Sequence, residues 1–344
     1  MSIAASRLTL AALLLGLVVA AMGATWSSPA RPASSVRLSG IEYIDLAEFC
    51  ARYGLKRESL SRNRVVYRSE WTTLEFDLES RDHSINGLRV FSGEAIRNHR
   101  GKILVSQLDA EKLLTPILRP GTNMAQVPTL KTIVIDPGHG GRDPGKVNLR
   151  AKVMEKDMAL DTAKRAKALL EKEGYKVFLT RSDDRYLDLP ERAEIAGRHH
   201  ADLFIAIHFN AVEARPEQVT GIEVFSLTPR FQYSTADAMR EDDDEAKMAG
   251  PGNRFDHWNM AASYAMHREL IGDLKVSDRG LKRARWKVLV LAPCPATYVE
   301  AGYLSNDAEA RKIATPAYRQ KLAEGITSGV RAYAATLAQL RARS

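Results

Sequence analysis

The sequence predicts an α/β protein with a mostly parallel central sheet and helices on both faces, preceded by a small β-rich domain. From residue 131 onward, short continuous apolar runs alternate with longer segments of helical periodicity. That alternation is typical of buried parallel strands joined by helices. Before residue 120, shorter runs separated by turn signals indicate antiparallel strands. With 344 residues, of which 45% are hydrophobic and 27% charged, the chain is long enough for two such domains.

The first residues have the pattern of an export signal. Arg7 precedes the apolar run of residues 8–21, and the small residues Gly23 and Ala24 follow it. A positive start, a short apolar core and a small-residue exit are typical of a secretory signal peptide. We therefore expect a signal peptide over residues 1–24 and a periplasmic or extracellular protein. An uncleaved anchor is the alternative, because the run falls just short of the about 20 residues that span a membrane.

Residues 36–120 are predicted to form the small β-rich domain. An Asn-Gly hairpin signal at Asn86 and Gly87 lies between two of its expected strands. The region contains no cluster of residues that chemistry would require, so we interpret it as a spacer or binding domain. It resembles the small N-terminal stalk domain of copper amine oxidases. Strands are expected at residues 41–46, 64–68, 73–78, 88–91 and 102–106. Helices are expected at residues 47–53 and from the last of these strands through Leu118, where Pro120 stops the helix.

Residues 121–130 are interpreted as a linker, and residues 131–340 as the α/β domain. The helix expected at residues 155–173 has apolar side chains at helical spacing and is closed by Gly174. A long helix at residues 316–340 is expected to close the domain. Strands are expected at residues 132–136, 175–180, 202–208, 221–227, 287–291 and 296–300, and further helices at residues 190–198 and 259–272.

Charge and cysteine content exclude some classes of function. The formal net charge is +8, yet Lys and Arg are scattered among nearly as many acids, with no dense basic tract. We therefore expect no nucleic-acid binding, and only a general attraction to polyanions such as wall polymers. Cys50 and Cys294 fall in separate predicted domains, so we expect two buried free thiols rather than a disulfide.

Three polar residues stand where predicted buried strands end. His139 follows TIVID in the turn DPGHGG, His208 ends DLFIAIH, and Glu300 ends ATYVE. Ligands of open α/β sheets collect beyond the carboxyl ends of the strands, so these side chains are candidates to converge. A fourth residue, Glu155, opens the helix after the glycine-rich loop.

Two histidines and a carboxylate with one open position are a common catalytic zinc site. Zinc lowers the pKa of a bound water and polarises a carbonyl group, and a second carboxylate can transfer the proton to a leaving amine. Each residue also has a simpler interpretation. A histidine at a strand end is more often structural, and a glutamate in a first helical turn favours the helix dipole. Spacing alone leaves both interpretations open.

The stretch TIVIDPGHGGRDPG resembles the opening of the zinc-dependent N-acetylmuramoyl-L-alanine amidases, which cleave bacterial peptidoglycan. The motifs that follow occur in the family's order over about residues 131–333. They are EKDMALDTAKRAKALLEKEGYKVFLTRSDD, LPERAEIAG, ADLFIAIHFNA, GIEVFSL, SDRGLK and YVEAGYLSN. The resemblance implies that residues 131–340 are a zinc amidase catalytic domain.

The resemblance also assigns roles to residues. His139, Glu155 and His208 correspond to the zinc ligands, and Glu300 corresponds to the catalytic carboxylate. This chain departs from the family's usual residues beside two of these positions, and the departures put the shape of the substrate groove in doubt. They are Ala206 and Phe209 around His208, and Ala301 after Glu300.

Residues 228–256, here called the acidic segment, include the acid-rich stretch REDDDEAKM. A solvated surface loop is the simpler interpretation. In several amidases of the family, an insertion at this place forms a helix that covers the metal site until a partner protein removes it. The resemblance therefore makes autoinhibition and an activator protein open hypotheses. The candidate carboxylates are those of Glu241, Asp242, Asp243, Asp244 and Glu245.

The predicted function is zinc-dependent hydrolysis of the amide bond between N-acetylmuramic acid and L-alanine in peptidoglycan, by a monomer. A wall-binding protein that keeps the fold without catalysis is the alternative, and retention of all four candidate residues argues against it. A glycosidase with two carboxylates is a third hypothesis. It would need no metal, so loss of activity on chelation would separate the two enzymes.

Overall fold

The computed structural model describes residues 35–122, 126–235 and 244–343. The predicted signal peptide lies outside these residues. The described residues belong to one compact unit. Within the described ranges, no helix is both long and apolar enough to cross a membrane.

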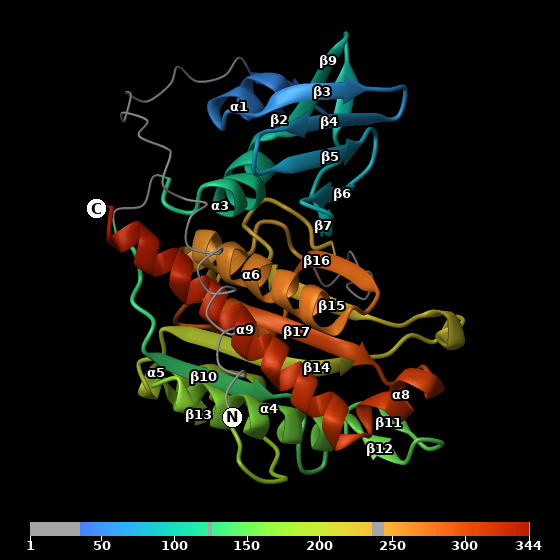
Figure 1. The fold of residues 1–344 in the computed structure, drawn as a ribbon, viewed down its shortest axis with the longest axis vertical. Coiled ribbons are helices and arrows are strands. Elements are labelled where there is room, and N and C mark those ends of the chain that lie inside the picture. The colour runs from blue at the N-terminus through green and yellow to red at the C-terminus, as the bar shows by residue number, and fades with distance from the viewer. Residues whose placement is uncertain (1–34, 123–125, 236–243, 344) are drawn as a thin grey trace, which may run out of the picture. The chain divides into compact units, whose positions relative to one another are not determined.

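A mostly parallel sheet forms the centre of residues 131–340, as predicted (Figure 1). Four strands in the order β13-β10-β14-β17 are parallel to one another, whereas β15 is antiparallel to β17 and parallel to β16. The carboxyl ends of β10, β14 and β17 therefore share one edge, here called the site edge. The strands are β10 (Thr132–Pro137), β13 (Lys176–Leu179), β14 (Leu203–Asn210), β15 (Ile222–Leu227), β16 (Asp278–Ala284) and β17 (Ala296–Tyr303).

Helices cover both faces of this sheet. On one face α9 packs against α4 and α6, and on the other α5 packs against α7. Side chains of Asp188 and Thr315 cap the first turns of α5 and α9, which fixes where these helices begin. The helices are α4 (Glu155–Lys172), α5 (Leu189–Arg198), α6 (Asp256–Leu274), α7 (Lys287–Leu291), α8 (Asp307–Ile313) and α9 (Pro316–Arg341).

One sequence-based expectation in this region was wrong, and one strand was not predicted. KVLVL, predicted as a strand, is helix α7, where Val288, Leu289 and Val290 are all buried. A five-residue apolar run fits either a buried strand or a buried helix, so periodicity could not decide between them. Strand β16 was not predicted, because its sequence DRGLKRA carries charges. Those charges are buried in ion pairs of Lys282 and Arg283.

The region before residue 120 is β-rich, as predicted. One part is a four-stranded sheet in the order β1-β2-β9-β8. The strands β7-β6-β5-β4-β3 are antiparallel and continue the central sheet beyond β16, where Val90 pairs with Leu281. The strands are β1 (Ser35–Leu38), β2 (Ile41–Asp45), β3 (Lys56–Leu60), β4 (Arg64–Arg68), β5 (Thr73–Asp77), β6 (Asp82–Ile85), β7 (Leu88–Phe91), β8 (Arg97–His99) and β9 (Lys102–Ser106). Helical segments are α1 (Leu46–Arg52), α2 (Gln107–Asp109), η1 (Ala110–Leu114) and α3 (Thr115–Leu118).

The face of the sheet under α5 and α7 leads directly to the site edge. Phe204 and Ala206 of β14 are buried in the core on this face. Side chains alternate along a strand, so His208 points to the same face two residues further on. The hydrophobic core on this face of the sheet thus extends up to His208 at the site edge.

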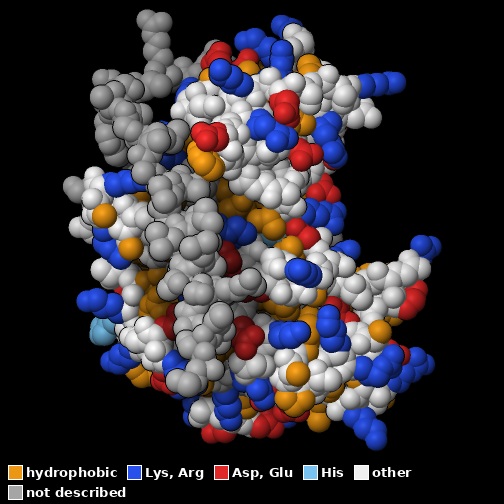
Figure 2. Space-filling model, viewed as in Figure 1, with side chains coloured by type: hydrophobic (Ala, Val, Ile, Leu, Met, Phe, Trp, Pro, Cys, Tyr) orange, Lys and Arg blue, Asp and Glu red, His pale blue; other side chains and the backbone are white. Residues whose placement is uncertain are grey.

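Lys and Arg side chains are spread over the visible face among Asp and Glu side chains (Figure 2). The net positive charge of the chain is therefore not gathered into one basic tract on this face.

Candidate metal centre

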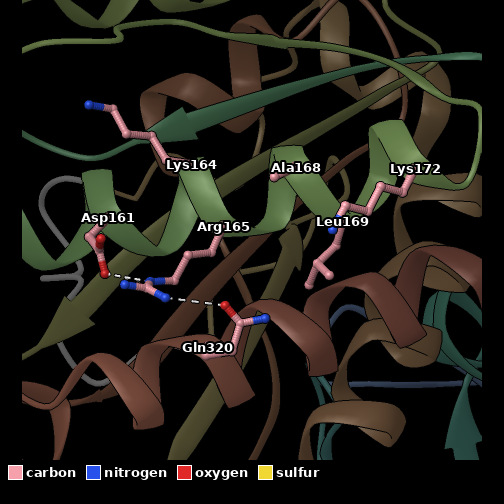
Figure 3. Close-up of a pocket in the computed structure, with 7 residues that line it drawn as sticks. All are labelled: Asp161, Lys164, Arg165, Ala168, Leu169, Lys172 and Gln320. Carbon is pink, nitrogen blue, oxygen red and sulfur yellow. Dashed lines mark hydrogen bonds and ion pairs between the residues drawn. The ribbon is translucent and has the colours of Figure 1, made fainter.

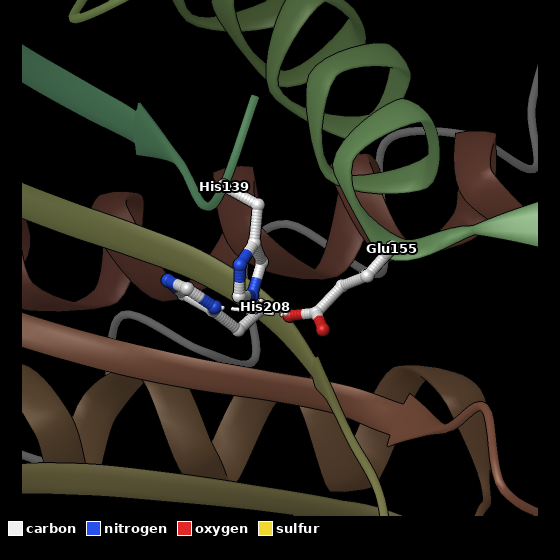
Figure 4. A group of neighbouring side chains, drawn as sticks. All are labelled: His139, Glu155 and His208. Atoms are coloured by element: carbon white, nitrogen blue, oxygen red, sulfur yellow. Dashed lines mark hydrogen bonds and ion pairs between the residues drawn. The ribbon is translucent and has the colours of Figure 1, made fainter. Parts of the chain in front are cut away.

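Three of the predicted residues meet at the site edge (Figure 4). His139 follows β10, His208 lies on β14, and Glu155 is the first residue of α4. Nε2 of His139 lies 2.9 Å from Oε1 of Glu155, and Nδ1 of His208 lies 3.0 Å from the same oxygen. Their ligand atoms all lie within 4.8 Å of one another, so a single metal ion could bind all three.

The orientation of His139 leaves a lone pair facing the cluster. Its Nδ1 lies 2.8 Å from Oδ2 of Asp143 and donates to that carboxylate when the ring is neutral. Nε2 is then an acceptor that faces another acceptor, the Glu155 carboxylate. Either a proton or a cation must lie between them. A histidine held by a carboxylate in this way is the usual arrangement of a metal ligand.

Two glycines make room for the cluster. A Cβ atom at Gly138 would overlap the imidazole ring of His208. At Gly145, where φ is +63°, a Cβ atom would lie 2.6 Å from Oε2 of Glu155 and 2.6 Å from Cδ2 of His139. The glycines of DPGHGGRDPG are thus needed for close approach of the loop to its own ligands.

Two buried arginines hold the loop in place. Nη2 of Arg181 donates to the carbonyl of Gly138 at 2.7 Å, and Nη2 of Arg192 donates to the carbonyl of His139 at 2.8 Å. Arg192 also pairs with Asp136 at 2.8 Å, and both of these side chains are fully buried. These hydrogen bonds therefore fix the backbone at Gly138 and His139.

Glu300 lies beside the cluster on the neighbouring strand. It pairs in register with His208, and both line a pocket at the site edge. Its Oε2 is buried and has no hydrogen-bond partner among the described residues. The other lining residues are His139, Gly145, Lys146, Glu155, Phe209, Asn210, Ala211 and Tyr298.

Tyr298 and Glu223 shape the surroundings of Glu300. The ring of Tyr298 stacks on His208, with 4.5 Å between centroids. Glu223 pairs in register with Glu300 on β15, and its own charge is balanced by Lys282 at 2.8 Å and by the amide of Asn210 at 2.8 Å. Glu300 is thus the carboxylate in this group that lacks a balancing cation.

The pKa values of these groups follow from burial and from their neighbours. Burial most strongly raises the pKa of Glu300, and the charges of Glu155 and Glu223 raise it further, well above its usual range. Burial would also raise the pKa of Glu155, but hydrogen bonds from His139 and His208 outweigh it and the pKa is lowered. Burial would lower the pKa of His139, and its bonds to Glu155 and Asp143 reverse this, so the pKa is raised. The two glutamates therefore differ: Glu155 is held ionised and Glu300 is biased towards its protonated form.

The acidic segment does not offer Asp244 to the metal centre. Because β15 is antiparallel to β17, the segment leaves β15 at the edge of the sheet opposite the site edge. Asp244 is buried there in an ion pair with Arg285, which also donates to the carbonyls of Pro229 and Gln232. The hypothesis that Asp244 is a blocking carboxylate is therefore wrong. Glu245 is exposed, and Glu241, Asp242 and Asp243 lie outside the described residues.

A second depression lies between α4 and α9 (Figure 3). Arg165 donates to Asp161 at 2.7 Å and to Gln320 at 3.2 Å. These three polar side chains of the depression are therefore already paired with one another. These contacts join the two helices, and we interpret the depression as part of helix packing.

Sequence reasoning missed the supporting residues. Asp143 stands four residues after His139 in the glycine-rich loop, which was a readable signal for a carboxylate that orients a ligand. Arg181 and Arg192 lie within the quoted motifs LTRSDD and LPERAEIAG, but no local pattern shows which carbonyls they bind. Tyr298 was read only as part of a buried strand.

The fold and the cluster define an α/β protein with a candidate metal centre at the carboxyl ends of its strands. The sequence profile of N-acetylmuramoyl-L-alanine amidases matches residues 133–332, more than half of the chain. This chain therefore belongs to the N-acetylmuramoyl-L-alanine amidase family.

Named relatives show how far the similarity extends. The amidase AmiC of Escherichia coli is 34% identical over 230 residues, which cover 61% of this chain and 54% of AmiC. AmiA of Escherichia coli is 31% identical over 222 residues, 59% of this chain and 76% of AmiA. The solved structure of AmiC2 from Nostoc punctiforme is 31% identical, covers 59% of this chain and 96% of that one, and has a TM-score of 0.48. The chain thus spans about half the length of AmiC and, at 52%, of the probable amidase AmiB of Haemophilus influenzae.

Proposed function

We propose that this protein is a zinc-dependent amidase that hydrolyses the bond between N-acetylmuramic acid and L-alanine in peptidoglycan. One observation carries the proposal: His139, Glu155 and His208 converge at the site edge with Glu300 beside them. The chain's membership of the amidase family supports the choice of substrate.

The residues present fit a zinc ion. Two imidazole nitrogens and one carboxylate oxygen form a donor set that zinc prefers, and a cation between His139 and Glu155 would satisfy both acceptors. His139, Glu155 and His208 would hold the ion. When bound, the metal would supply an activated water and polarise the amide carbonyl.

The chain's own residues would orient the ligands and transfer the proton. Asp143 keeps the Nδ1 proton of His139, so that Nε2 stays available as a ligand. Glu300 is the proposed general base and acid: its carboxylate would take a proton from the attacking water and donate it to the nitrogen of the leaving L-alanine. Its raised pKa suits the donating step, because a carboxyl group that stays protonated near neutral pH can protonate an amine.

We further propose that the protein acts outside the cytoplasm as a monomer. The export signal predicted over residues 1–24 would deliver it to peptidoglycan. Residues 36–120 would be an accessory domain, joined by the linker 121–130 to the catalytic domain 131–340. An activator that works through Asp244 is not part of this proposal, because that residue is held at the opposite edge of the sheet.

Digestion of purified peptidoglycan tests the proposed function. The enzyme should release peptides with a free L-alanine amino terminus and leave intact muramic acid on the glycan, as identified by mass spectrometry. A chelator should abolish this, and added zinc should restore it. New reducing sugar ends that form equally well with chelator would show a glycosidase instead. Binding to peptidoglycan without any new termini would support the non-catalytic alternative.

A further inference from the structure

One cation belongs to the wall of the pocket and has no partner among the described residues. Lys146 is the only Lys or Arg among the described residues that line the pocket. Within the described parts of the chain, its ammonium group makes neither an ion pair nor a hydrogen bond. It is partly exposed, so it can reach a bound molecule.

Three nearby basic residues differ in this respect. Lys156 binds Asp184 at 2.7 Å and the carbonyl of Gly141 at 3.0 Å. Arg150 binds Asp307 at 2.6 Å. Arg142 lies over the ring of Tyr186, 4.2 Å from its centroid. These three hold the loop, whereas the charge of Lys146 is left unused by the fold.

The backbone of Lys146 is fixed beside the cluster of His139, Glu155 and His208 drawn in Figure 4. Its N–H donates to Oε2 of Glu155 at 2.9 Å, and its carbonyl accepts from the N–H of Glu155 at 2.9 Å. The side chain therefore extends from a rigid position next to a candidate ligand. A charge placed in this way loses less entropy on binding than one on a mobile loop.

Among the residues that line the pocket, Lys146 supplies the one Lys or Arg side chain that could pair with an acidic ligand. A stem peptide with an acidic residue after L-alanine would present a carboxylate next to the scissile bond. Lys146 could pair with that carboxylate and fix the peptide's position.

We propose that Lys146 is a specificity-determining residue that binds the free α-carboxylate of the peptide's second residue. This inference rests on the proposed amidase function and deepens it. It assigns to the enzyme a preference for stem peptides with a free carboxylate at that position over peptides that carry a carboxamide there.

The test uses two soluble muropeptides that differ only in whether this α-carboxyl group is free or amidated. The wild-type enzyme should prefer the free carboxylate by about tenfold in kcat/KM, as expected for one charge-assisted hydrogen bond. Lys146→Met should lose about tenfold on the carboxylate substrate, chiefly through KM, and change little on the amidated one. Lys146→Arg should keep most of the preference.

Lys152→Met is the matched control, since Lys152 is an exposed cation of the same loop that does not line the pocket. It should behave as wild type. Zinc content should be unchanged in every variant, and the Kd of the carboxylate substrate should rise about tenfold when Lys146→Met is added to an inactive Glu300→Gln enzyme.

The outcomes separate this inference from the function on which it rests. If the wild-type enzyme cleaves neither muropeptide, the proposed function fails. If it cleaves both and Lys146→Met slows both equally, or slows neither, Lys146 does not read the carboxylate and the inference is overturned.

Discussion

At the scale of single residues, the candidate site depends on side chains that orient the candidate metal ligands. The sequence was sufficient to nominate His139, Glu155, His208 and Glu300, because each stands at the end of an expected element within a family motif. The spacing of Asp143 from His139 was a signal, but it did not show that this carboxylate sets which nitrogen of His139 faces the cluster. That role depends on the fold of the loop, where His139 has a left-handed backbone with φ of +57°.

Removal of this carboxylate should weaken metal binding without unfolding the protein. Asp143→Ala is expected to lower zinc affinity by roughly 10–100-fold, because the histidine loses the partner that fixes its tautomer and ring orientation. Competition with a chromophoric chelator measures the affinity. Asp183→Ala is the control, since Asp183 is 65% exposed and lies on a nearby loop. Unchanged affinity in Asp143→Ala would show that the contact does not orient a ligand.

His83 gives a pH-dependent prediction away from the metal centre. Burial lowers its pKa from 6.5 to about 4. The unfolded chain therefore binds a proton below about pH 6.5 that the folded chain does not bind until about pH 4, so this residue lowers stability as the pH falls through that window. At pH 4 the loss approaches about 3 kcal/mol.

Denaturant unfolding of wild type and His83→Gln at pH 7 and pH 4.5 tests this. The substitution removes the hydrogen bond to Ser92, so it should cost stability at both values. The difference in free energy of unfolding between wild type and His83→Gln should shrink by about 2 kcal/mol on acidification. A constant difference would contradict a neutral buried histidine.

At the scale of elements, alternation and helical spacing predicted most of the strands and helices around the site. The failures have physical causes. KVLVL is too short for its hydrophobic period to distinguish a strand from a helix. The charged residues of β16 are buried because Lys282 and Arg283 form ion pairs with Glu223 and Asp109, which are distant in sequence. The close approach of the β10 loop to β14 was also invisible, since it depends on Gly138 having no side chain opposite His208.

This approach can be tested by adding one methyl group. Gly138→Ala places a Cβ atom where the His208 ring lies, so the ring or the loop must move. We expect at least about a tenfold loss of zinc affinity, comparable to the loss of a ligand-orienting contact. Gly272→Ala in α6 is the control, because no atom lies within 4 Å of its added Cβ and alanine favours a helix. Normal zinc binding by Gly138→Ala would contradict the packing described here.

At the scale of the whole molecule, one sheet links the N-terminal β-rich region to the α/β region. The link is reinforced by a buried ion pair between Asp109 and Arg283. Asp109 also accepts hydrogen bonds from the N–H groups of Gly93 and Glu94 and from Ser106. Composition and turn signals predicted two regions, but a pair separated by 174 positions could not be read from local patterns.

Breaking this pair should destabilise the protein strongly. Asp109→Ala leaves the Arg283 guanidinium buried without its partner, which is expected to lower the free energy of unfolding by about 3–5 kcal/mol. Asp77→Ala breaks the exposed ion pair with Arg64, where the side chains are 43% and 52% exposed, and should change it by less than about 1 kcal/mol. Equal effects in chemical denaturation would argue against a buried link between the regions.

The central claim is a division of roles: three residues hold the metal, and Glu300 transfers the proton. The most direct measurement is zinc content and peptidoglycan cleavage in the same preparations of wild type and Glu300→Gln. The account predicts about one zinc per chain in both proteins and a loss of activity of roughly 10²–10⁴-fold in the variant. In His208→Ala, metal and activity should fall together. Turnover near that of wild type in Glu300→Gln, or full activity in a wild-type enzyme free of metal, would contradict the account.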